Sequence, residues 1–257
     1  MTKVNLNADM AEGFGAYDIG DDMAMLKIVG SANVACGFHG GDANVMDRVV
    51  AGAKSEGVSI GAHPGFNDLW GFGRRRITMA QREVEAMIAY QIGALQAMAA
   101  MHGMKVTHMK PHGALNNMAS EDKDLAETIV RATRAVDPSI ILLATTGSEL
   151  MKAGATLDVP TASEVFADRT YDSKGSLTSR KRDDAMIRDP QQAVEHVLRM
   201  LETGKVRSTD GVDVPVVVHS ICIHGDEPTG PAVAGAVRAA LEANGIEVVT
   251  LPEVPLN

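Results

Sequence analysis

The sequence predicts an α/β fold built as a TIM-like (β/α) barrel, distorted or seven-stranded, with residues 1–257 forming one domain. Short apolar stretches alternate about seven times with longer stretches of helical period, which is typical of a parallel α/β domain. Polar residues recur on one parity of most predicted strands, whereas an open sheet covered on both faces would show apolar runs. We therefore favour the barrel and keep an open, doubly wound sheet as the alternative.

The strands are predicted from apolar stretches that are followed by polar or glycine-rich segments. In chain order they are Lys3–Asp9, Ser31–Cys36, Val58–His63, Val106–Lys110, Ile140–Ala144, Thr161–Phe166 and Val216–Cys222, with a weaker candidate at Glu247–Leu251. Alternate side chains of a strand point to opposite faces, so one face of each strand would be polar and the other apolar.

Helices are predicted between these strands, at about 21–29, 43–56, 79–102, 121–136, 147–153, 190–203 and 230–244. The third helix has a candidate capping box, Thr78 with Gln81 three residues later. The sixth begins with Asp189 as cap and Pro190 at the first helical position. Asp42 precedes the second helix and is either its N-cap or a functional residue.

Composition and charge exclude several classes of function. The formal net charge is -9, so the chain repels polyanions, and we expect neither nucleic-acid nor membrane-surface binding. The two cysteines, Cys36 and Cys222, are too far apart for a CxxC metal motif or a disulfide framework. No apolar run approaches the roughly 20 residues that span a bilayer, and no signal peptide is visible. We expect a cytoplasmic protein.

Nearly every predicted strand is followed by ionisable side chains. Because the carboxyl ends of parallel strands meet at one mouth of a barrel, these groups are expected to converge there. Carboxylates and imidazoles at close range shift one another's pKa values and can supply acid and base catalysis, and a buried lysine can neutralise an oxyanion or a phosphoryl group. The converging set is Asp9, His39, His63, Lys110, His112, Glu164, Asp168 and His224, with Glu12, Arg169, Arg180 and Asp226 close by in sequence.

Other patterns are ambiguous. Many strand-end acids and histidines only cap helices, and Cys36 and Cys222 are expected to serve packing. No HExxH motif or other tight ligand spacing is present, so the metal signal is weak, and no P-loop sequence occurs. Gly71-Phe-Gly73 with the three arginines after it could bind an anion. The polar stretch 168–183 is either a solvated loop or a lid over the mouth, with Arg169, Lys174, Arg180 and Arg182 available for an anion.

Six segments in register resemble one family. They are NLNADMAEGFG, SANVACGFHGGD, GAHPGFND with GFGRR, KPHGALNN, SEVFADRTYDSKGSLTSR and HGDEPTG. Their order and spacing are similar to those of the LamB/YcsF family of lactam-utilisation proteins along residues 3 to about 250. Ala8 stands where family members often have Cys, and Asn116-Asn117 where Tyr-Asn is common, but no charged residue of the pattern is altered.

The resemblance implies a fold similar to the glycoside hydrolase/deacetylase barrels. It also implies the function of the A subunit of ATP-hydrolysing 5-oxoprolinase, which works with subunits B and C. The reaction converts 5-oxo-L-proline, ATP and water to L-glutamate, ADP and phosphate. ATP is thus the expected co-substrate of the complex, and a divalent metal remains an open possibility.

The residues would then divide the work. Asp9 or Glu12 with His39 would activate water, Lys110 and His112 would stabilise the oxyanion or phosphoryl oxygens, and Arg169 or Arg180 would bind the substrate carboxylate. The remaining candidates for substrate binding are His63, Glu164, Asp168, His224 and Asp226. Two other functions are considered: a metal-dependent deacetylase-like amidohydrolase, and a non-catalytic subunit that only binds the lactam.

Overall fold

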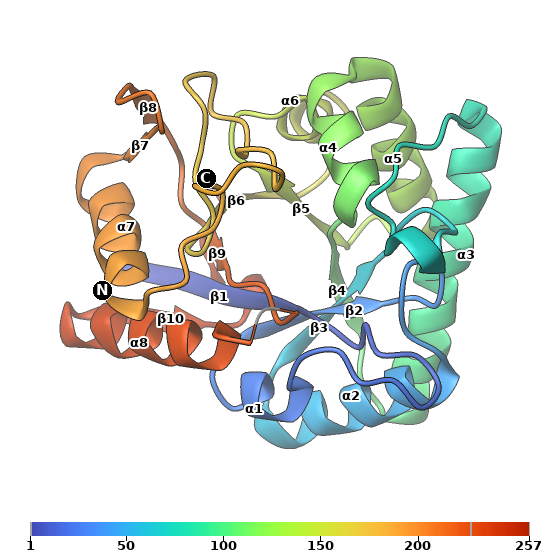
Figure 1. The fold of residues 1–257 in the computed structure, drawn as a ribbon. Helices are drawn as coiled ribbons and strands as arrows, with labels where there is room; N and C mark the ends of the chain where they lie inside the picture. The colour runs from blue at the N-terminus through green and yellow to red at the C-terminus, as the bar shows by residue number, and fades with distance from the viewer. Residues whose placement is uncertain (1, 227, 257) are drawn as a thin grey trace.

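The computed structural model describes residues 2–226 and 228–256, which form a closed barrel of seven parallel strands surrounded by helices (Figure 1). Each strand pairs with the next along the chain, and β9 closes the barrel by pairing with both β6 and β1. The TIM-like, seven-stranded prediction is confirmed. The barrel strands are β1 (Thr2–Met10), β2 (Ser31–Ala35), β3 (Ser59–His63), β4 (Val106–Met109), β5 (Ile141–Thr145), β6 (Thr161–Phe166) and β9 (Ser220–Cys222). The organisation of the chain as one domain stays a prediction.

The helices follow the strands in the order expected of a (β/α) barrel. They are α1 (Asp22–Leu26), α2 (Ala43–Glu56), α3 (Gln81–Met101), α4 (Gly113–Glu121), α5 (Lys123–Val136), α6 (Glu149–Thr156), α7 (Pro190–Thr203) and α8 (Gly230–Ala243), with short 3-10 turns η1 (Leu69–Gly71) and η2 (Leu251–Glu253). Two predicted caps are confirmed, because the Asp42 carboxylate accepts from the amides of Asn44 and Val45 and that of Asp189 accepts from Gln192.

Several local predictions were wrong. The third helix begins at Gln81 rather than at residue 79, and its capping box is not Thr78 with Gln81 but joins the Glu83 carboxylate to the Ala80 amide at 2.8 Å. Helix α4 was missed, because only Asp122 separates it from α5. This residue ends α4, and its carboxylate caps α5 by accepting from the Leu125 amide. The antiparallel pair β7 (Lys205–Arg207) and β8 (Asp213–Pro215), each three residues long, was also missed, and the last barrel strand begins at Ser220 rather than at Val216.

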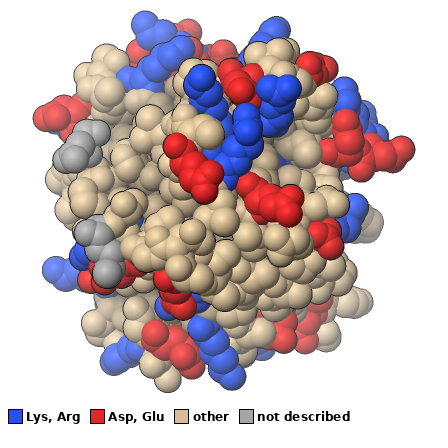
Figure 2. Space-filling model, turned by 90° about the vertical axis from the view of Figure 1, so that its left-hand side faces the viewer, with Lys and Arg blue, Asp and Glu red and all other residues tan. Residues whose placement is uncertain are grey.

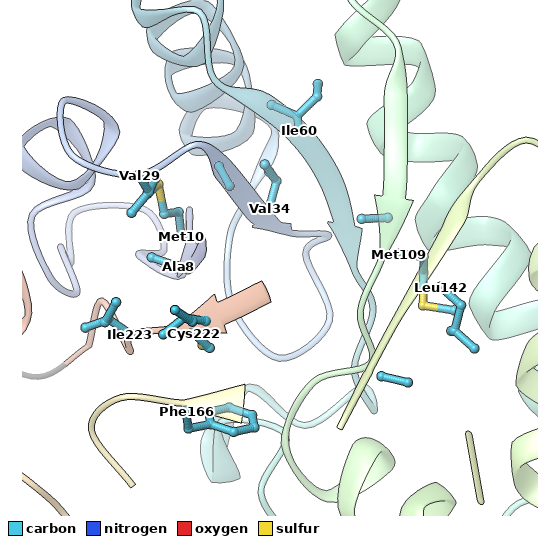
Figure 3. Close-up of a cluster of buried hydrophobic side chains, with 14 of the residues drawn as sticks. Ala8, Met10, Val29, Val34, Ile60, Met109, Leu142, Phe166, Cys222 and Ile223 are labelled. Atoms are coloured by element: carbon cyan, nitrogen blue, oxygen red, sulfur yellow. The ribbon is translucent and has the colours of Figure 1, made fainter. Parts of the chain in front are cut away.

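Most strands are polar on their inner face and apolar on their outer face, as the parity argument predicts; β5 is the exception, being apolar on both faces over Ile141–Ala144. Outward residues such as Ala8, Met10, Ile60 and Met109 are buried in the layer between barrel and helices (Figure 3). Inward residues bond across the barrel: the Asn5 amide donates to Ser31 Oγ, and the Asn7 amide donates to Glu164 Oε1 at 3.0 Å and Ser220 Oγ at 2.7 Å. The polar interior is therefore a hydrogen-bonded layer rather than a water-filled pore.

The end of the barrel opposite the strand carboxyl ends is closed by an apolar floor. Strand β10 (Ile246–Val249) pairs with Thr2–Asn5 of β1 and leads into η2. Ile141, Leu143 and Ala162 of the barrel form a second, small core there with Val249, Leu251 and Val254. Because one end is filled, access to the polar interior comes from the strand carboxyl ends.

The outer surface carries charges of both signs. On the face drawn in Figure 2, basic and acidic side chains lie next to one another, with wide areas of other residues between them. In the described part of the chain, no helix is both long and apolar enough to cross a membrane.

Candidate active site at the mouth of the barrel

A cleft of about 460 Å³ opens at the carboxyl ends of the strands. This volume lies in the range of small-molecule sites. Its lining comes from nearly every strand end: Asp9 on β1 and Glu12 after it, His63 on β3, Lys110 and His112 after β4, Thr145 on β5 and residues 146–148 after it, Phe166 on β6 and Arg169 after it, and His224 and Asp226 after β9. The barrel thus brings together residues from the two ends of the sequence.

An ion-paired lysine lies at the base of the cleft. The Lys110 ammonium is 3.0 Å from Asp9 Oδ1, 3.0 Å from Glu164 Oε1 and 3.1 Å from Cys222 Sγ. Asn33 donates to the same Asp9 oxygen at 2.8 Å. All of these side chains are buried, so the ammonium is held in one position, and a ligand would reach it from the cleft.

The charges in this group depend on one another. Burial opposes the ammonium, but Asp9, Cys222 and Glu164 raise the pKa of Lys110 well above its ordinary value. Burial also opposes ionisation of Asp9, yet His63 and Lys110 hold the pKa of its carboxyl well below the ordinary value. Burial raises the pKa of Glu164, because one ammonium does not fully compensate two buried carboxylates. Burial raises the pKa of Cys222 too, which keeps the side chain as a thiol rather than the nucleophilic thiolate.

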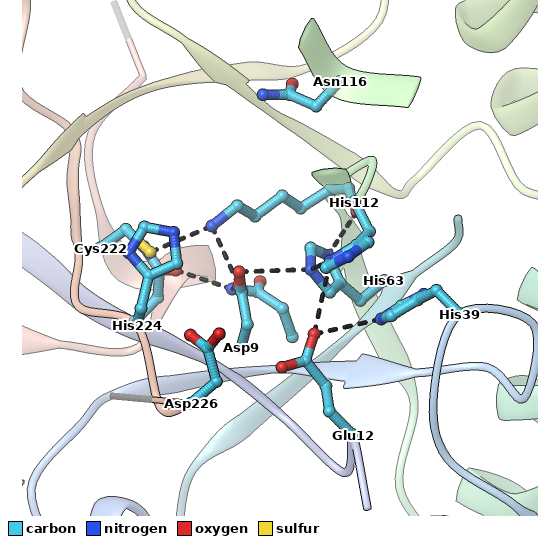
Figure 4. A network of polar contacts seen from close by, with 12 residues as sticks. Asp9, Glu12, His39, His63, His112, Asn116, Cys222, His224 and Asp226 are labelled. Atoms are coloured by element: carbon cyan, nitrogen blue, oxygen red, sulfur yellow. Dashed lines mark hydrogen bonds and ion pairs between the residues drawn. The ribbon is translucent and has the colours of Figure 1, made fainter. Parts of the chain in front are cut away.

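Three imidazoles and a carboxylate form a second group beside the lysine. Glu12 Oε1 lies 3.1 Å from His39 Nε2 and 3.3 Å from His112 Nδ1, and His112 Nδ1 lies 3.0 Å from His63 Nε2 (Figure 4). The rings of His39 and His112 stack with their centroids 3.6 Å apart. Burial and the nearby Asp9 raise the pKa of Glu12 to about 8, and burial lowers the pKa values of His39 and His112 well below the ordinary value.

Glycines allow the rings to stack so closely. A Cβ atom on Gly73 would lie 2.7 Å from the Cβ of His39 and 2.8 Å from Cδ2 of His112, and one on Gly65 would lie 2.6 Å from Nδ1 of His39. Gly73 also has φ +61°, a conformation that favours glycine. The glycines of the segments around residues 65 and 73 are thus explained by packing against the site.

The opposite wall holds a third group. Both carboxylate oxygens of Asp168 lie within 3.0 Å of His224 Nδ1, and one accepts from the His224 amide at 2.9 Å. Burial opposes ionisation, but the His224 contacts lower the pKa of Asp168. Asp226 accepts from Arg74 Nη2 at 2.6 Å, which joins the loops after β9 and β3 across the cleft.

The stretch 168–183 contributes a wall of the cleft through residues 176–181. Arg169 is buried, and its guanidinium donates to the carbonyls of Ala185 and Thr178, which fixes its orientation. Burial and the charge of Arg180 lower the pKa of Arg169 to about 10. Of the four cations that the lid alternative made available for an anion, Arg169 and Arg180 line the cleft, whereas Lys174 and Arg182 do not, and Arg182 pairs with Asp184.

The structure gathers the predicted site residues in one region, but not all reach the cleft surface. His39, Glu164 and Asp168 are behind it, each in contact with a lining residue. Asp9, Glu12, His63, Lys110, His112, Arg169, Arg180, His224 and Asp226 line it.

Sequence reasoning undervalued some contributors. It assigned Cys222 to packing and did not include Asn7 and Asn33 among the site residues, although their contacts with Lys110, Glu164 and Asp9 connect them to the site. It passed over Asn116, whose amide donates to Thr145 Oγ1 at the cleft wall. The strand parity of Asn7 and Cys222 was the available signal.

Comparison with known proteins shows which family and which solved structures this chain is similar to. The model of the LamB/YcsF family matches residues 4–255. A protein of Rhodopseudomonas palustris, named as the A subunit of 5-oxoprolinase, is 50% identical over 247 residues, 96% of this chain and 97% of its own length. The structure of a lactam utilization protein from Thermus thermophilus has 42% identity and a TM-score of 0.92, covering 97% of this chain and 100% of that one. A CE4 family pseudoenzyme, at 12% identity and a TM-score of 0.51 over 98% of this chain and 67% of that one, shares the fold alone.

Proposed function

The chain belongs to the LamB/YcsF family, and we propose that it is the A subunit of an ATP-hydrolysing 5-oxoprolinase that opens 5-oxo-L-proline to L-glutamate. The observation that carries this proposal is the near-complete alignment with a relative of that name, joined to a polar cleft suited to a small anionic amide. Subunits B and C would be its partners, and ATP would be consumed by the assembled complex.

The chemistry of the substrate explains why ATP is needed. A five-membered lactam is resonance-stabilised, and its carbonyl carbon is a poor electrophile. The γ-phosphoryl group of ATP would be transferred to the amide oxygen with release of ADP, after which water attacks the carbon and the ring C–N bond breaks as the nitrogen takes up a proton. A second water would then release phosphate from the resulting acyl phosphate and leave L-glutamate. The chain's own residues would then have three tasks: to bind the carboxylate of the substrate, to stabilise negative charge on oxygen, and to move a proton from water.

Lys110 is the group placed to stabilise negative charge. Its ammonium is held by Asp9 and Glu164 in a buried position that lines the cleft, so little reorganisation would be needed during the reaction. Asp9 is the candidate to take the proton from water. Its Oδ1 already accepts from Lys110 and Asn33, while Oδ2 lies 3.3 Å from His63 Nε2 and is the oxygen available for a new contact.

Arg169 is the candidate to bind the substrate carboxylate. It lines the cleft, and the two backbone carbonyls that accept from its Nε and Nη2 keep the guanidinium in one orientation. A planar, pre-oriented guanidinium suits a carboxylate. Arg74 lines the same cleft but already binds Asp226, so we assign it to holding the two loops together.

The test is a reconstitution assay with 5-oxo-L-proline and ATP, in which glutamate and phosphate are both measured. The complete set of subunits should release the two products in equal amounts, and the chain alone should release almost none. Asp9→Asn should slow the complete set by at least about 100-fold, the size of a lost acid–base contribution. The matched control is His102→Gln, because His102 is the C-cap of α3, does not line the cleft, and its side chain pairs with Asp47.

Three outcomes would count against the proposal. Absence of ATP-coupled glutamate from the full set would overturn the substrate assignment. Glutamate release by the chain alone without ATP would favour the deacetylase-like amidohydrolase. Undiminished turnover by Asp9→Asn, with binding intact, would favour a subunit that only holds the lactam.

A further inference from the structure

The buried group of Glu12, His39, His63 and His112 has the composition of a metal-ion site. Among residues 2–226 and 228–256, one ligand atom from each of these four side chains lies within 4.8 Å of the others. The four come from the ends of four adjacent segments, β1 to β4, and their exposed fractions are 4%, 0%, 1% and 4%. Because the imidazoles are buried and close together, they do not form a solvated surface cluster.

Two backbone carbonyls decide which nitrogens face inward. His63 Nδ1 lies 2.8 Å from the Lys110 carbonyl, and His112 Nε2 lies 2.8 Å from the Phe72 carbonyl. A carbonyl only accepts, so each of these nitrogens carries a hydrogen. The other nitrogens, His63 Nε2 and His112 Nδ1, face each other at 3.0 Å, and in neutral rings both are acceptors. A cation beside both nitrogens would remove this repulsion, as would a proton on His63 Nε2, which also lies 3.3 Å from Asp9 Oδ2.

The carboxylate adds a third acceptor at the same point. Glu12 Oε1 is 3.3 Å from His112 Nδ1 and 3.1 Å from His39 Nε2. The remaining nitrogen of His39, Nδ1, is buried and has no hydrogen-bond partner among the described residues, so an ion bound at Nε2 would replace the hydrogen that this ring otherwise donates to Glu12. The rings of His39 and His112 are within 3° of parallel, so one of them would turn to direct its lone pair at a centre shared with Glu12 and His63.

We propose that Glu12, His39, His63 and His112 bind one divalent transition-metal ion, for which Zn²⁺ is the best-suited probe. With metal–nitrogen and metal–oxygen bonds of about 2.0–2.1 Å, neighbouring ligand atoms lie about 2.9–3.4 Å apart. The three adjacent separations, 3.0, 3.1 and 3.3 Å, all fall in this range. Three imidazoles and one carboxylate suit zinc and its transition-metal neighbours, whereas magnesium and calcium prefer oxygen ligands.

The surroundings have the features of a metal site as well. Metal-binding histidines usually donate their second nitrogen to a carbonyl or carboxylate, as His63 and His112 do here. Glu12, His63 and His112 line the cleft, so a bound ion would be open to a ligand from the cleft side. Such an ion could act as a Lewis acid toward an amide or phosphoryl oxygen. Metal binding itself does not depend on which amide the chain acts on.

The test uses the isolated full-length chain after treatment with a chelator, without substrate, ATP or partner subunits. Calorimetric titration with ZnCl₂ should give one ion per chain, and titration with MgCl₂ should show much weaker binding. Glu12→Gln and His112→Gln should each lower the affinity for Zn²⁺ at least tenfold, roughly the effect of disturbing even the outer shell of such a site. His102→Gln, a change of a partly exposed histidine outside the cluster, should leave the affinity unchanged.

Cobalt provides an independent readout, because Co²⁺ bound by nitrogen and oxygen in a site of low coordination number gives visible absorption bands that Glu12→Gln should change. If circular dichroism shows that His112→Gln does not fold, the result with Glu12→Gln decides, since this change keeps the length of the side chain and an oxygen acceptor for His39.

Absence of stoichiometric Zn²⁺ uptake would overturn the proposal in favour of a proton shared between His63 and His112. Uptake that neither variant weakens would place the ion elsewhere and also overturn it. Neither result would alter the outcome of the 5-oxoproline assay.

Discussion

Replacement of Lys110 by Met tests how much the buried charges at the base of the cleft contribute to stability. Methionine has a similar length and can keep the contact of the lysine stem with its surroundings, so the main loss is the ammonium. That loss leaves Asp9 and Glu164 as two buried carboxylates without their cation. Removing one partner of a buried ion pair costs about 3–5 kcal/mol, and we expect a loss of this size in the free energy of unfolding at neutral pH.

A second substitution separates the charge effect from simple disruption. Glu164→Gln removes one of the two carboxylates but keeps an oxygen that accepts from Asn7 and Lys110. Alone it should cost only about 1 kcal/mol, the size of a weakened hydrogen bond. In the double variant Lys110→Met/Glu164→Gln, only Asp9 lacks its ammonium, and Asn33 and His63 still contact it. The double variant should therefore be more stable than Lys110→Met by about 1–3 kcal/mol.

The measurement is urea unfolding followed by far-UV circular dichroism. Tryptophan fluorescence is unsuitable, because the single tryptophan, Trp70, is 98% exposed and its surroundings change little on unfolding. The reasoning fails if the two losses add within about 0.5 kcal/mol, since additivity would mean that Lys110 and Glu164 are energetically independent. A Lys110→Met variant as stable as the parent would equally contradict it.

Three further changes test the packing around the site. Tyr171→Phe removes the hydroxyl that accepts from the buried Phe166 amide at 2.8 Å and should cost about 1–3 kcal/mol in urea unfolding; a loss below 0.5 kcal/mol (roughly the error) would contradict this. Gly61→Ala places a Cβ 2.1 Å from the ring of His108, so we expect a loss of about 1–3 kcal/mol, and an unchanged midpoint would show that the ring moves freely. Burial raises the pKa of Asp22 to about 6, above its ordinary 3.8, so the folded state binds more protons than the unfolded state between these values and stability falls as the pH rises through this window. Asp22→Asn should therefore gain roughly 2–3 kcal/mol relative to the parent between pH 4 and pH 7, and a pH-independent difference would refute the burial effect.

The barrel could be predicted because its strands show their two faces directly in the sequence. In β1 the inward residues Asn5, Asn7 and Asp9 alternate with the outward residues Val4, Leu6 and Ala8, and the structure buries both sets. The same parity placed His108, Glu164 and Cys222 inside. Since side chains alternate strictly along a strand, a few polar positions per strand were enough to distinguish a barrel from an open sheet.

The fine geometry of the site could not be predicted in the same way, because loops do not preserve strand parity. Glu12 follows Ala11, whose φ of +60° turns the chain, so counting from Asp9 gives no direction for the Glu12 side chain. His112 is oriented by the Phe72 carbonyl, which comes from a 3-10 turn that was missed. Ligand spacing was uninformative for a related reason: each histidine of the cluster comes from a different strand end, so no short motif contains two of them.

The division between inner network and outer loops has a consequence for how the cleft works. Asn7 donates to Glu164 and Ser220, and its own oxygen accepts from Asn33, which also donates to Asp9. The oxygens that hold the Lys110 ammonium are therefore fixed from below by amides of the barrel wall, where satisfied polar groups resist displacement. The guanidinium of Arg169, by contrast, is held by carbonyls of the long segment after β6. Under the proposal that Arg169 binds the substrate carboxylate, changes in that segment should alter how tightly the carboxylate binds while leaving the ammonium in place. They would then change the affinity for substrate without changing the stabilisation of negative charge proposed for Lys110.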